Sequence, residues 1–225
     1  MARKNRREEI IKAARTLFYA KGYENTSVRD ILDEANVSNG TFFHQFESKQ
    51  ALLMAVIDEM GADMAAVVAP VMQEPDLTAV SRYQKLVAAD NAYRASESLA
   101  LNRLGEAVQS DWNMRLLFYL YQKGDEIYCP ALTQIIHQGI EEGVFDVALV
   151  PETAELWLSN CRHVRTAVYT IWQDRARYDD PYAVITRKLD AAQTAVDRLV
   201  GAPLGELLLL DKQAILNEFD TLNLA

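Results

Sequence analysis

Cysteine and long apolar runs are both scarce in this chain of 225 residues. The two cysteines, Cys129 and Cys161, lie far apart and have no nearby Cys or His ligands, so we expect reduced thiols rather than a disulfide or a metal site. No apolar run approaches the ~20 residues that a membrane span requires. The N-terminus opens on charged residues instead of the apolar region of a signal peptide. We therefore expect a cytoplasmic protein that does not contact the membrane.

Glycine and proline are also few, at 9 and 6 residues, while half of the chain is hydrophobic. This composition favours an all-α fold, and the length allows two structural units, since domains run to ~100–200 residues. The sequence contains no nucleophile paired with a base, no phosphate-binding loop, no metal-ligand spacing and no acid pair on one helix face. We expect neither an enzyme nor a cofactor.

Positive charge is in deficit overall but is unevenly distributed. The chain carries a net charge of −9, yet residues 1–50 hold nine Lys and Arg against seven Asp and Glu, so residues 51–225 carry −11. A basic N-terminus is by itself more often a solvated face than a binding surface. Only its coincidence with the motif described next favours a nucleic-acid interface.

Residues 26–49 predict two short helices joined by a tight polar turn. A Ser or Thr cap precedes the first helix, Asn36 breaks it, and Ser38 caps a second helix that contains residues 41–44. This spacing is typical of a helix-turn-helix. The apolar side chains of the first helix recur at helical intervals, at Val28, Ile31, Leu32 and Ala35.

The motif resembles that of the TetR family of bacterial transcriptional regulators over roughly residues 7–55. The residues that carry the resemblance are Val37-Ser38-Asn39-Gly40-Thr41, Phe43, Phe46 and Ser48-Lys49-Gln50-Ala51-Leu52. Residues 136–154 are similar, more loosely, to the turn between two ligand-domain helices of that family. The resemblance implies a three-helix DNA-binding domain over residues 1–50. It also implies a larger helical ligand-binding and dimerisation domain over residues 51–225.

In a helix-turn-helix, the N-terminal residues of the second helix face the base edges and the flanking residues bind phosphate. Asn39 is suited to adenine and Arg29 to guanine or phosphate. Phe43 stands where the family usually has tyrosine, so a hydroxyl that would bond phosphate is absent. The phenylalanines of the motif could equally form a small core, which we favour for Phe46. The predicted DNA-binding residues are Thr26, Arg29, Ser38, Asn39, Thr41, Phe43, His44 and Lys49.

The aromatic residues of the larger domain are the kind that would line an apolar ligand pocket, although each is also a suitable core residue. Asn160 adds a polar group that could orient a ligand. The predicted ligand-binding residues are Tyr83, Trp112, Phe118, Tyr121, Asn160 and Val164.

One recognition helix covers too few base pairs for tight specific binding, so we expect a homodimer on a palindromic double-stranded operator. The last two long helices, predicted over residues 151–177 and 181–200, offer an apolar stripe for a four-helix bundle across a two-fold axis. We expect a helix beginning at Ser48 to be the only long bridge between the domains. We also expect Pro130 to kink or split the helix that contains it.

The favoured function is a homodimeric repressor released from its operator by a small, largely apolar effector. Two alternatives remain open: a helical small-molecule carrier or enzyme that retains the N-terminal fold, and a DNA-binding protein that needs no ligand.

Overall fold

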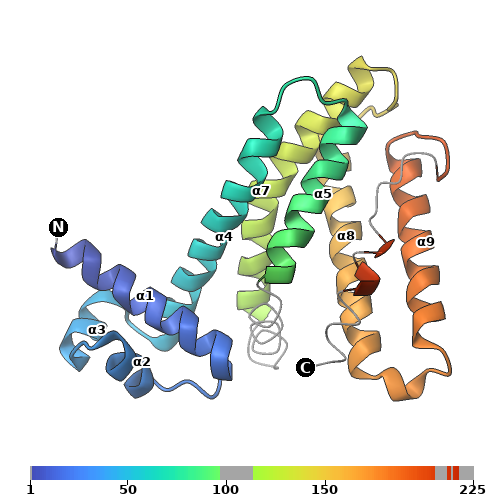
Figure 1. Cartoon of the computed structure of the whole chain (residues 1–225). Coiled ribbons are helices and arrows are strands. Elements are labelled where there is room, and N and C mark those ends of the chain that lie inside the picture. The colour runs from blue at the N-terminus through green and yellow to red at the C-terminus, as the bar shows by residue number, and fades with distance from the viewer. Residues whose placement is uncertain (1, 97–113, 206–211, 214, 218–225) are drawn as a thin grey trace. The chain divides into compact units, whose positions relative to one another are not determined.

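A computed structural model describes residues 2–96, 114–205, 212–213 and 215–217. The described residues form helices and no strand, as expected for an all-α protein (Figure 1). They divide into two compact units. Unit 1 contains residues 1–65 and 96–124, and unit 2 contains residues 66–95 and 125–225. The sequence predicts a domain boundary at residue 50, directly after the helix-turn-helix. The compact units divide the chain differently, because the first part of the next helix, up to residue 65, belongs to unit 1.

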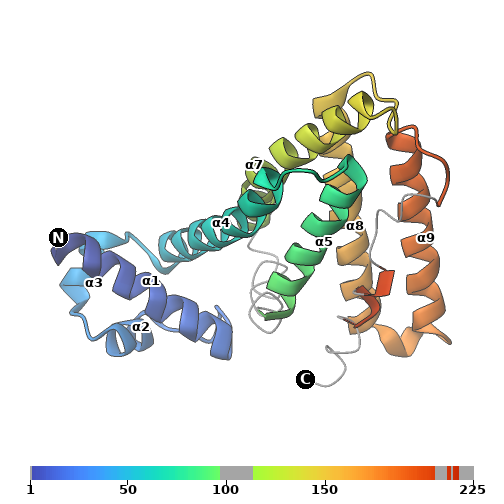
Figure 2. The ribbon, with the colours of Figure 1, turned by 45° about the horizontal axis from the view of Figure 1, so that its top comes forward.

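Unit 1 is built on α1 (Ala2–Lys21), α2 (Val28–Ala35), α3 (Asn39–Gln45) and the first part of α4 (Lys49–Gln73). Figure 2 shows α1 lying beside α2 and α3. Tyr119 and Leu120 of α7 (Met114–Glu141) pack against the same core. This core contains Ile10, Ile11, Ala14, Phe18, Ile31, Phe42, Phe46, Leu52, Leu53, Ala55, Val56, Ile57 and Met60.

The short helices of unit 1 begin and end where the sequence places a cap. At the start of α2, the Ser27 hydroxyl accepts from the Asp30 amide at 3.1 Å, and the Asp30 carboxylate accepts from the Ser27 amide at 2.6 Å. This reciprocal pair satisfies two backbone donors that a helix start leaves open. Asn36 ends α2 in the left-handed conformation, with φ of 50°. The predicted break at Asn36 is confirmed.

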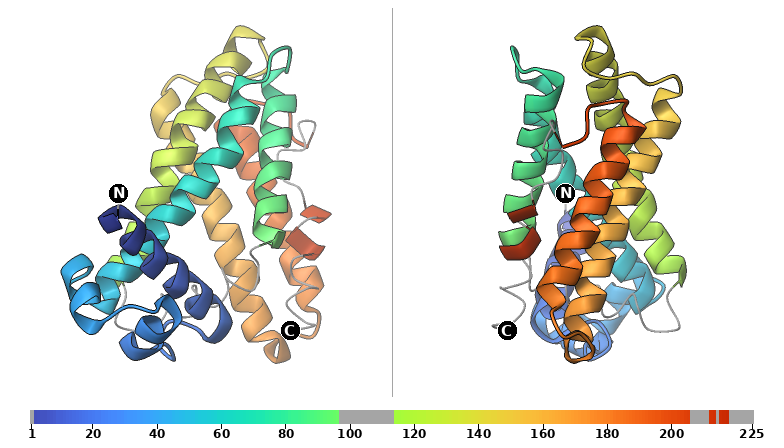
Figure 3. Two further views of the ribbon diagram at one scale, coloured as in Figure 1. Left: turned by 60° about the vertical axis from the view of Figure 1, so that its left-hand side comes forward. Right: turned by 90° about the vertical axis from the view of Figure 1, so that its right-hand side faces the viewer.

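Unit 2 contains the end of α4, α5 (Ala79–Ser96), most of α7, α8 (Val150–Gln173), a short 3₁₀ helix (Arg175–Arg177) and α9 (Pro181–Leu199). Helices α8 and α9 lie side by side (Figure 3, right). Val164, Val168 and Ile171 of α8 are buried against Ile185 and Leu189 of α9. The predicted last two long helices are therefore present and share a core.

The end of α4 is closed by one buried arginine. The Arg82 guanidinium donates to the carbonyl oxygens of Val71, Met72 and Glu74 at 2.8 to 3.2 Å, and its Nε donates to Gln138 Oε1 at 2.9 Å. The last carbonyls of a helix lack intrahelical donors, so this side chain supplies them. Arg82 thereby fixes the end of α4 to α5 and α7 within unit 2.

The long helices differ from the predictions in two respects. Pro130 does not split its helix, because α7 is continuous from Met114 to Glu141, while a kink at Pro130 stays a prediction. Pro130 is exposed, so water can satisfy the carbonyl that loses its donor, while neighbours such as Leu132 and Ile135 remain buried. Helix α4 is also not the only long bridge, since α7 contributes residues to both units.

Within the described ranges, no helix combines the length and the apolar character that crossing a bilayer requires.

Candidate nucleic-acid interface and effector region

The start of α3 is held by hydrogen bonds between its N-cap residue and its first turn. Ser38 is the N-cap, and its hydroxyl accepts from the Thr41 amide at 3.1 Å and lies 2.9 Å from the Thr41 hydroxyl. On the inner side of α3, Phe42 is fully buried and Phe46 is 4% exposed. The core reading of Phe46 is confirmed. These contacts fix the orientation of α3, and its opposite side faces solvent.

Five of the predicted DNA-binding residues are exposed. Phe43, at 51% exposed, stands edge-on to Phe42 with ring centroids 5.2 Å apart. Arg29 forms no hydrogen bond or ion pair with the part of the chain that the structure describes. The exposed residues of the predicted set are Arg29, Ser38, Asn39, Phe43 and His44, and Thr41 is half-buried.

Thr26 does not belong to this exposed surface. Its side chain is fully buried, and its hydroxyl donates to the carbonyl oxygen of Gly22 at 2.7 Å. A hydroxyl used in this way holds the turn between α1 and α2. We therefore remove Thr26 from the proposed DNA contacts.

Lys49 is likewise directed inward. Its ammonium donates to the carbonyl oxygens of Tyr23 and Thr26 at 2.9 and 3.0 Å, and lies 4.1 Å from the centroid of the Tyr23 ring. Burial lowers the pKa of Lys49, and the charge of Glu24 opposes this shift. In this structure Lys49 braces the α1–α2 turn against the start of α4, so we replace the predicted phosphate contact with a structural role.

Replacing Lys49 by methionine is expected to lower the free energy of unfolding by ~1–3 kcal/mol, because two charged hydrogen bonds to backbone carbonyls are lost. Urea denaturation followed by circular dichroism measures this change. The matched variant is Arg29→Met, which should leave stability unchanged and reduce the salt dependence of DNA binding by about one counterion. A loss of salt dependence on removing Lys49, with stability intact, would restore the phosphate contact.

Gly40 is a residue of this surface for which the sequence suggested no role. A Cβ atom added there would meet only the Ser38 hydroxyl, at 3.9 Å. Packing within the chain therefore does not require glycine, although glycine inside a helix costs ~1 kcal/mol relative to alanine. One feature of the sequence could have hinted at a role for Gly40, namely that it directly follows Asn39 in the first turn of α3.

The predicted ligand-binding residues are not gathered in one place. Tyr83 is buried in unit 2, where its hydroxyl accepts from Trp157 Nε1 at 3.2 Å. Burial raises the pKa of Tyr83 well above its usual range, so this hydroxyl remains neutral. Val164 packs against α9, and the Asn160 amide donates to the Ala192 carbonyl at 2.9 Å, so both support the α8–α9 contact.

The remaining members of the predicted ligand set belong elsewhere. Phe118 and Tyr121 are part of unit 1. Phe118 is 70% exposed, so it does not line an enclosed pocket. Trp112 lies outside the described residues.

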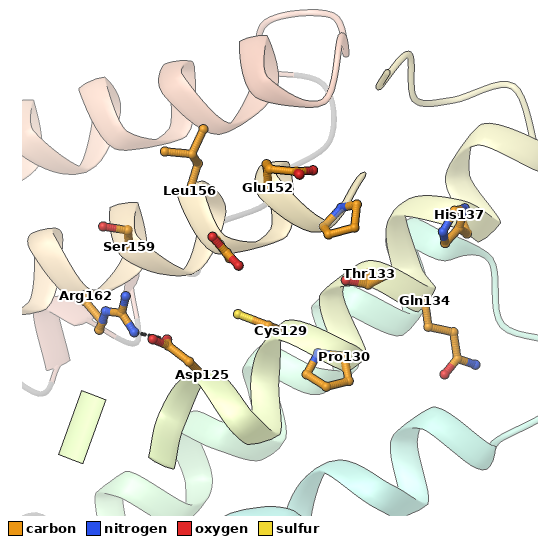
Figure 4. A pocket seen from close by; sticks show the side chains of 12 residues that line it. Asp125, Cys129, Pro130, Thr133, Gln134, His137, Glu152, Leu156, Ser159 and Arg162 are labelled. Carbon is orange, nitrogen blue, oxygen red and sulfur yellow. Dashed lines mark hydrogen bonds and ion pairs between the residues drawn. The ribbon is translucent and has the colours of Figure 1, made fainter. Parts of the chain in front are cut away.

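A groove of about 1080 Å³ lies between α7 and α8 of unit 2 (Figure 4). Cys129 and Pro130 form part of one wall, and Leu156, 56% exposed, lies on the other. An ion pair between Asp125 and Arg162 joins the two helices at the groove. Burial raises the pKa of the Cys129 thiol, so it remains protonated and a weak nucleophile. Sequence periodicity could not reveal this groove, because it depends on how α7 and α8 pack.

Comparison with known proteins places the helix-turn-helix region. Residues 10–56 match the model of the bacterial regulatory proteins of the tetR family. The helix-turn-helix region of the chain is therefore that of the TetR family of bacterial transcriptional regulators. The match covers α2, α3 and the turn between them, and therefore the whole of the exposed surface described above.

Curated relatives match part of the chain. The chain is 30% identical over 89 residues to the repressor DhaR of Mycobacterium sp. strain GP1, covering 40% of this chain and 45% of DhaR. It is 42% identical over 64 residues to the repressor AcnR of Corynebacterium diphtheriae, covering 28% and 34%. The alignments span less than half the length of these relatives. Both relatives are named as transcriptional repressors, in agreement with the prediction of a regulator rather than an enzyme.

Solved structures extend the likeness of fold to nearly the whole chain. RolR in complex with resorcinol matches with a TM-score of 0.61 and 17% identity, over 95% of this chain and 94% of RolR. The fatty acid degradation regulator FadR from Bacillus halodurans matches with a TM-score of 0.60 and 19% identity, over 83% and 94%. At such identities the likeness concerns the fold alone.

Proposed function

We propose that this TetR-family chain is a sequence-specific, double-stranded DNA-binding repressor that acts in the cytoplasm. The observation that carries the proposal is the exposed face of α3. Asn39 and Phe43 point outward from a helix that Phe42 and Ser38 hold in place. Asn39 opens α3, where side chains of a recognition helix meet base edges. Its amide can donate to and accept from adenine in the major groove.

Gly40 supports this role for α3. No neighbouring residue of the chain requires a glycine at position 40. The absence of a side chain at Gly40 therefore allows the backbone of another molecule to approach α3 closely. A DNA strand along the start of α3 is the partner that fits this position. Arg29, exposed and without an ion pair among the described residues, is placed to bind phosphate or guanine.

We propose a homodimer that uses the outer faces of α8 and α9 and binds a palindromic operator. The two helices share a core on one side and carry exposed side chains such as Tyr182 on another. A two-fold axis through such a pair gives a four-helix bundle. It also sets two recognition helices about 34–36 Å apart, or a multiple of that distance.

We further propose that a small effector releases the operator. RolR, whose fold is similar, is known with resorcinol bound, and the groove between α7 and α8 has the volume of a small-molecule site. The groove combines apolar walls with polar side chains, which suits a compact and largely apolar ligand. An effector acts by binding one state of the dimer more tightly than the other.

Substituting Asn39 by alanine is expected to remove discrimination at one base step, worth ~1–3 kcal/mol, while binding to unrelated DNA stays the same. The operator is first selected from a random pool of duplexes by the wild-type chain. Fluorescence anisotropy then compares the selected site, a site altered at each base, and unrelated DNA. Asn25→Ala, a change outside α3, should leave all three affinities unchanged. Equal losses on every duplex for the Asn39 variant would contradict a base contact, and failure to select any site would contradict the repressor.

A further inference from the structure

A cluster of charged and polar side chains is largely buried within unit 2, between α5, α7 and α8. Asp90 of α5, whose side chain is 13% exposed, is its centre. Its carboxylate accepts from Arg94 Nε at 2.7 Å and from the Tyr128 hydroxyl at 2.5 Å, and lies 3.5 Å from Arg165 Nη2. Burial alone would raise the pKa of Asp90, but Arg94, Arg165 and the Tyr128 hydroxyl together hold it below its ordinary value. Both carboxylate oxygens are therefore charged and already in use.

Asn91 lies next to this carboxylate and is held in one orientation. Arg165 Nη2 donates to Asn91 Oδ1 at 2.8 Å. Because a guanidinium has only donors, the atom facing it must be the amide oxygen, and the position of the amide nitrogen follows. Asn91 Nδ2 is buried and has no hydrogen-bond partner.

A buried donor without a partner costs ~1–3 kcal/mol, and such groups are few in native proteins. The Asp90 carboxylate, which accepts from Tyr128, Arg94 and Arg165, does not accept from Asn91 Nδ2 in this structure. The Tyr128 hydroxyl donates to Asp90 and does not accept from Asn91 Nδ2 either. No group of the described residues within hydrogen-bond reach supplies the acceptor, which leaves another molecule to do so.

The surroundings indicate what that molecule can be. One helical turn before Arg165 on α8, the Cys161 thiol lies 4.0 Å from the Tyr83 hydroxyl, and the Tyr83 ring packs at a tilt against Trp157 with ring centroids 4.6 Å apart. The line of side chains between α5 and α8 therefore changes from aromatic at Tyr83 to charged at Asp90 and Arg165. This order suits a compact ligand with an apolar body and one oxygen-bearing end.

We propose that Asn91 Nδ2 is the polar anchor of a ligand site in unit 2 that takes a small aromatic molecule bearing an oxygen acceptor. The inference rests on the proposed effector response, but it concerns this buried cluster and not the groove between α7 and α8, and it names the chemistry of the ligand that the cluster would bind. The Arg165 guanidinium next to Asn91 favours a negatively charged oxygen, so a carboxylate binds more tightly than an alcohol. A hydrocarbon of the same size leaves the donor unsatisfied and binds weakest.

Nuclear magnetic resonance of the full chain tests the site directly. Asp90–Asn91 is the only Asp-Asn pair in the sequence, so labelling aspartate with carbonyl ¹³C and asparagine with ¹⁵N isolates one backbone signal, from which the Asn91 side-chain amide is assigned. Benzoate, benzyl alcohol and toluene are then titrated at millimolar concentrations. We expect benzoate to shift the Asn91 amide signals at the lowest concentration and toluene to leave them in place. Signals that move with none of the probes, accompanied by a cross-relaxation peak to water, would assign the acceptor to a bound water and overturn the proposal.

A variant separates the anchor from a general effect on packing. Asn91→Asp keeps an oxygen for Arg165 and replaces the free donor, so benzoate affinity should fall by about tenfold or more. Asn217→Asp, the same change at an exposed position, should leave it unchanged. Equal affinities in all three proteins would overturn the proposal, and the wild-type titration decides the matter if the Asn91 variant fails to fold.

Operator binding is measured in parallel, so that the two proposals fail separately. Benzoate that shifts Asn91 without changing operator affinity would leave the site in place and remove its role as effector site. A chain that selects no DNA would remove the repressor but not the ligand site.

Discussion

Replacing Phe42 by alanine is expected to abolish operator binding by unfolding the helix-turn-helix, although Phe42 cannot touch DNA. The ring is fully buried in the core of unit 1, 5.2 Å from the Phe43 centroid and 6.0 Å from that of Phe46. Truncating a buried phenylalanine typically costs ~3–5 kcal/mol. This is a large part of the ~5–15 kcal/mol that stabilises a domain. Chemical denaturation should show the loss, and operator binding should disappear with it.

The neighbouring residue provides the control. Phe43 is 51% exposed, so Phe43→Ala should change stability by less than ~1 kcal/mol while it still removes a side chain from the proposed DNA-facing surface. The two variants thus separate folding from contact within two adjacent positions. The assignment of faces on α3 would be reversed if Phe43→Ala were the unstable variant.

Substituting Gly139 by alanine is expected to destabilise unit 2, even though alanine is the better helix former. A Cβ atom at this position of α7 would lie 2.0 Å from Phe145 Cδ2 and 2.7 Å from Cγ. Phe145 is 5% exposed and packs edge-on against Trp157, so its ring has little room to withdraw. Overpacking of this kind costs ~1–3 kcal/mol, or several degrees in Tm for a chain of this size. Calorimetric scanning measures the shift.

A second glycine of the same helix gives the matched control. A Cβ atom at Gly124 would meet nothing within 4 Å, so Gly124→Ala should be neutral or stabilising by up to ~1 kcal/mol. Combining Gly139→Ala with Phe145→Leu should recover part of the loss, because the smaller side chain frees the space. A stabilising effect of Gly139→Ala alone would mean that Phe145 repacks freely.

The elements that could be predicted from the sequence are those fixed by neighbouring residues. Ser27 and Ser38 cap α2 and α3, and Asn36 ends α2, because each acts on backbone groups within a few positions. Lys49 was assigned to phosphate because its actual partners are distant in the sequence. Lys49 bonds carbonyls 23 and 26 residues earlier in the chain, and no local pattern reveals such a partner.

The ligand candidates illustrate the same limit. Periodicity finds an aromatic stripe but not what packs against it, so the exposed Phe118 and the buried Tyr83 were indistinguishable in the sequence. The polar groups that carry the proposed anchor, Asp90, Asn91 and Arg165, come from two helices 74 or more residues apart. Their convergence depends on tertiary packing. The spacing of polar residues within either helix does not predict this convergence.

The core of unit 1 has a consequence for the construction of chimaeric regulators. Leu53, Val56 and Ile57 of α4 and Tyr119 of α7 complete the hydrophobic core beneath the helix-turn-helix. A graft that joins residues 1–50 to a foreign sensor domain would therefore remove one wall of that core. A portable DNA-reading module has to include the first half of α4, together with a replacement for the surface of α7. The unit that can be exchanged between regulators is thus defined by the helix faces that pack around this core, and cutting the chain at one position does not isolate it.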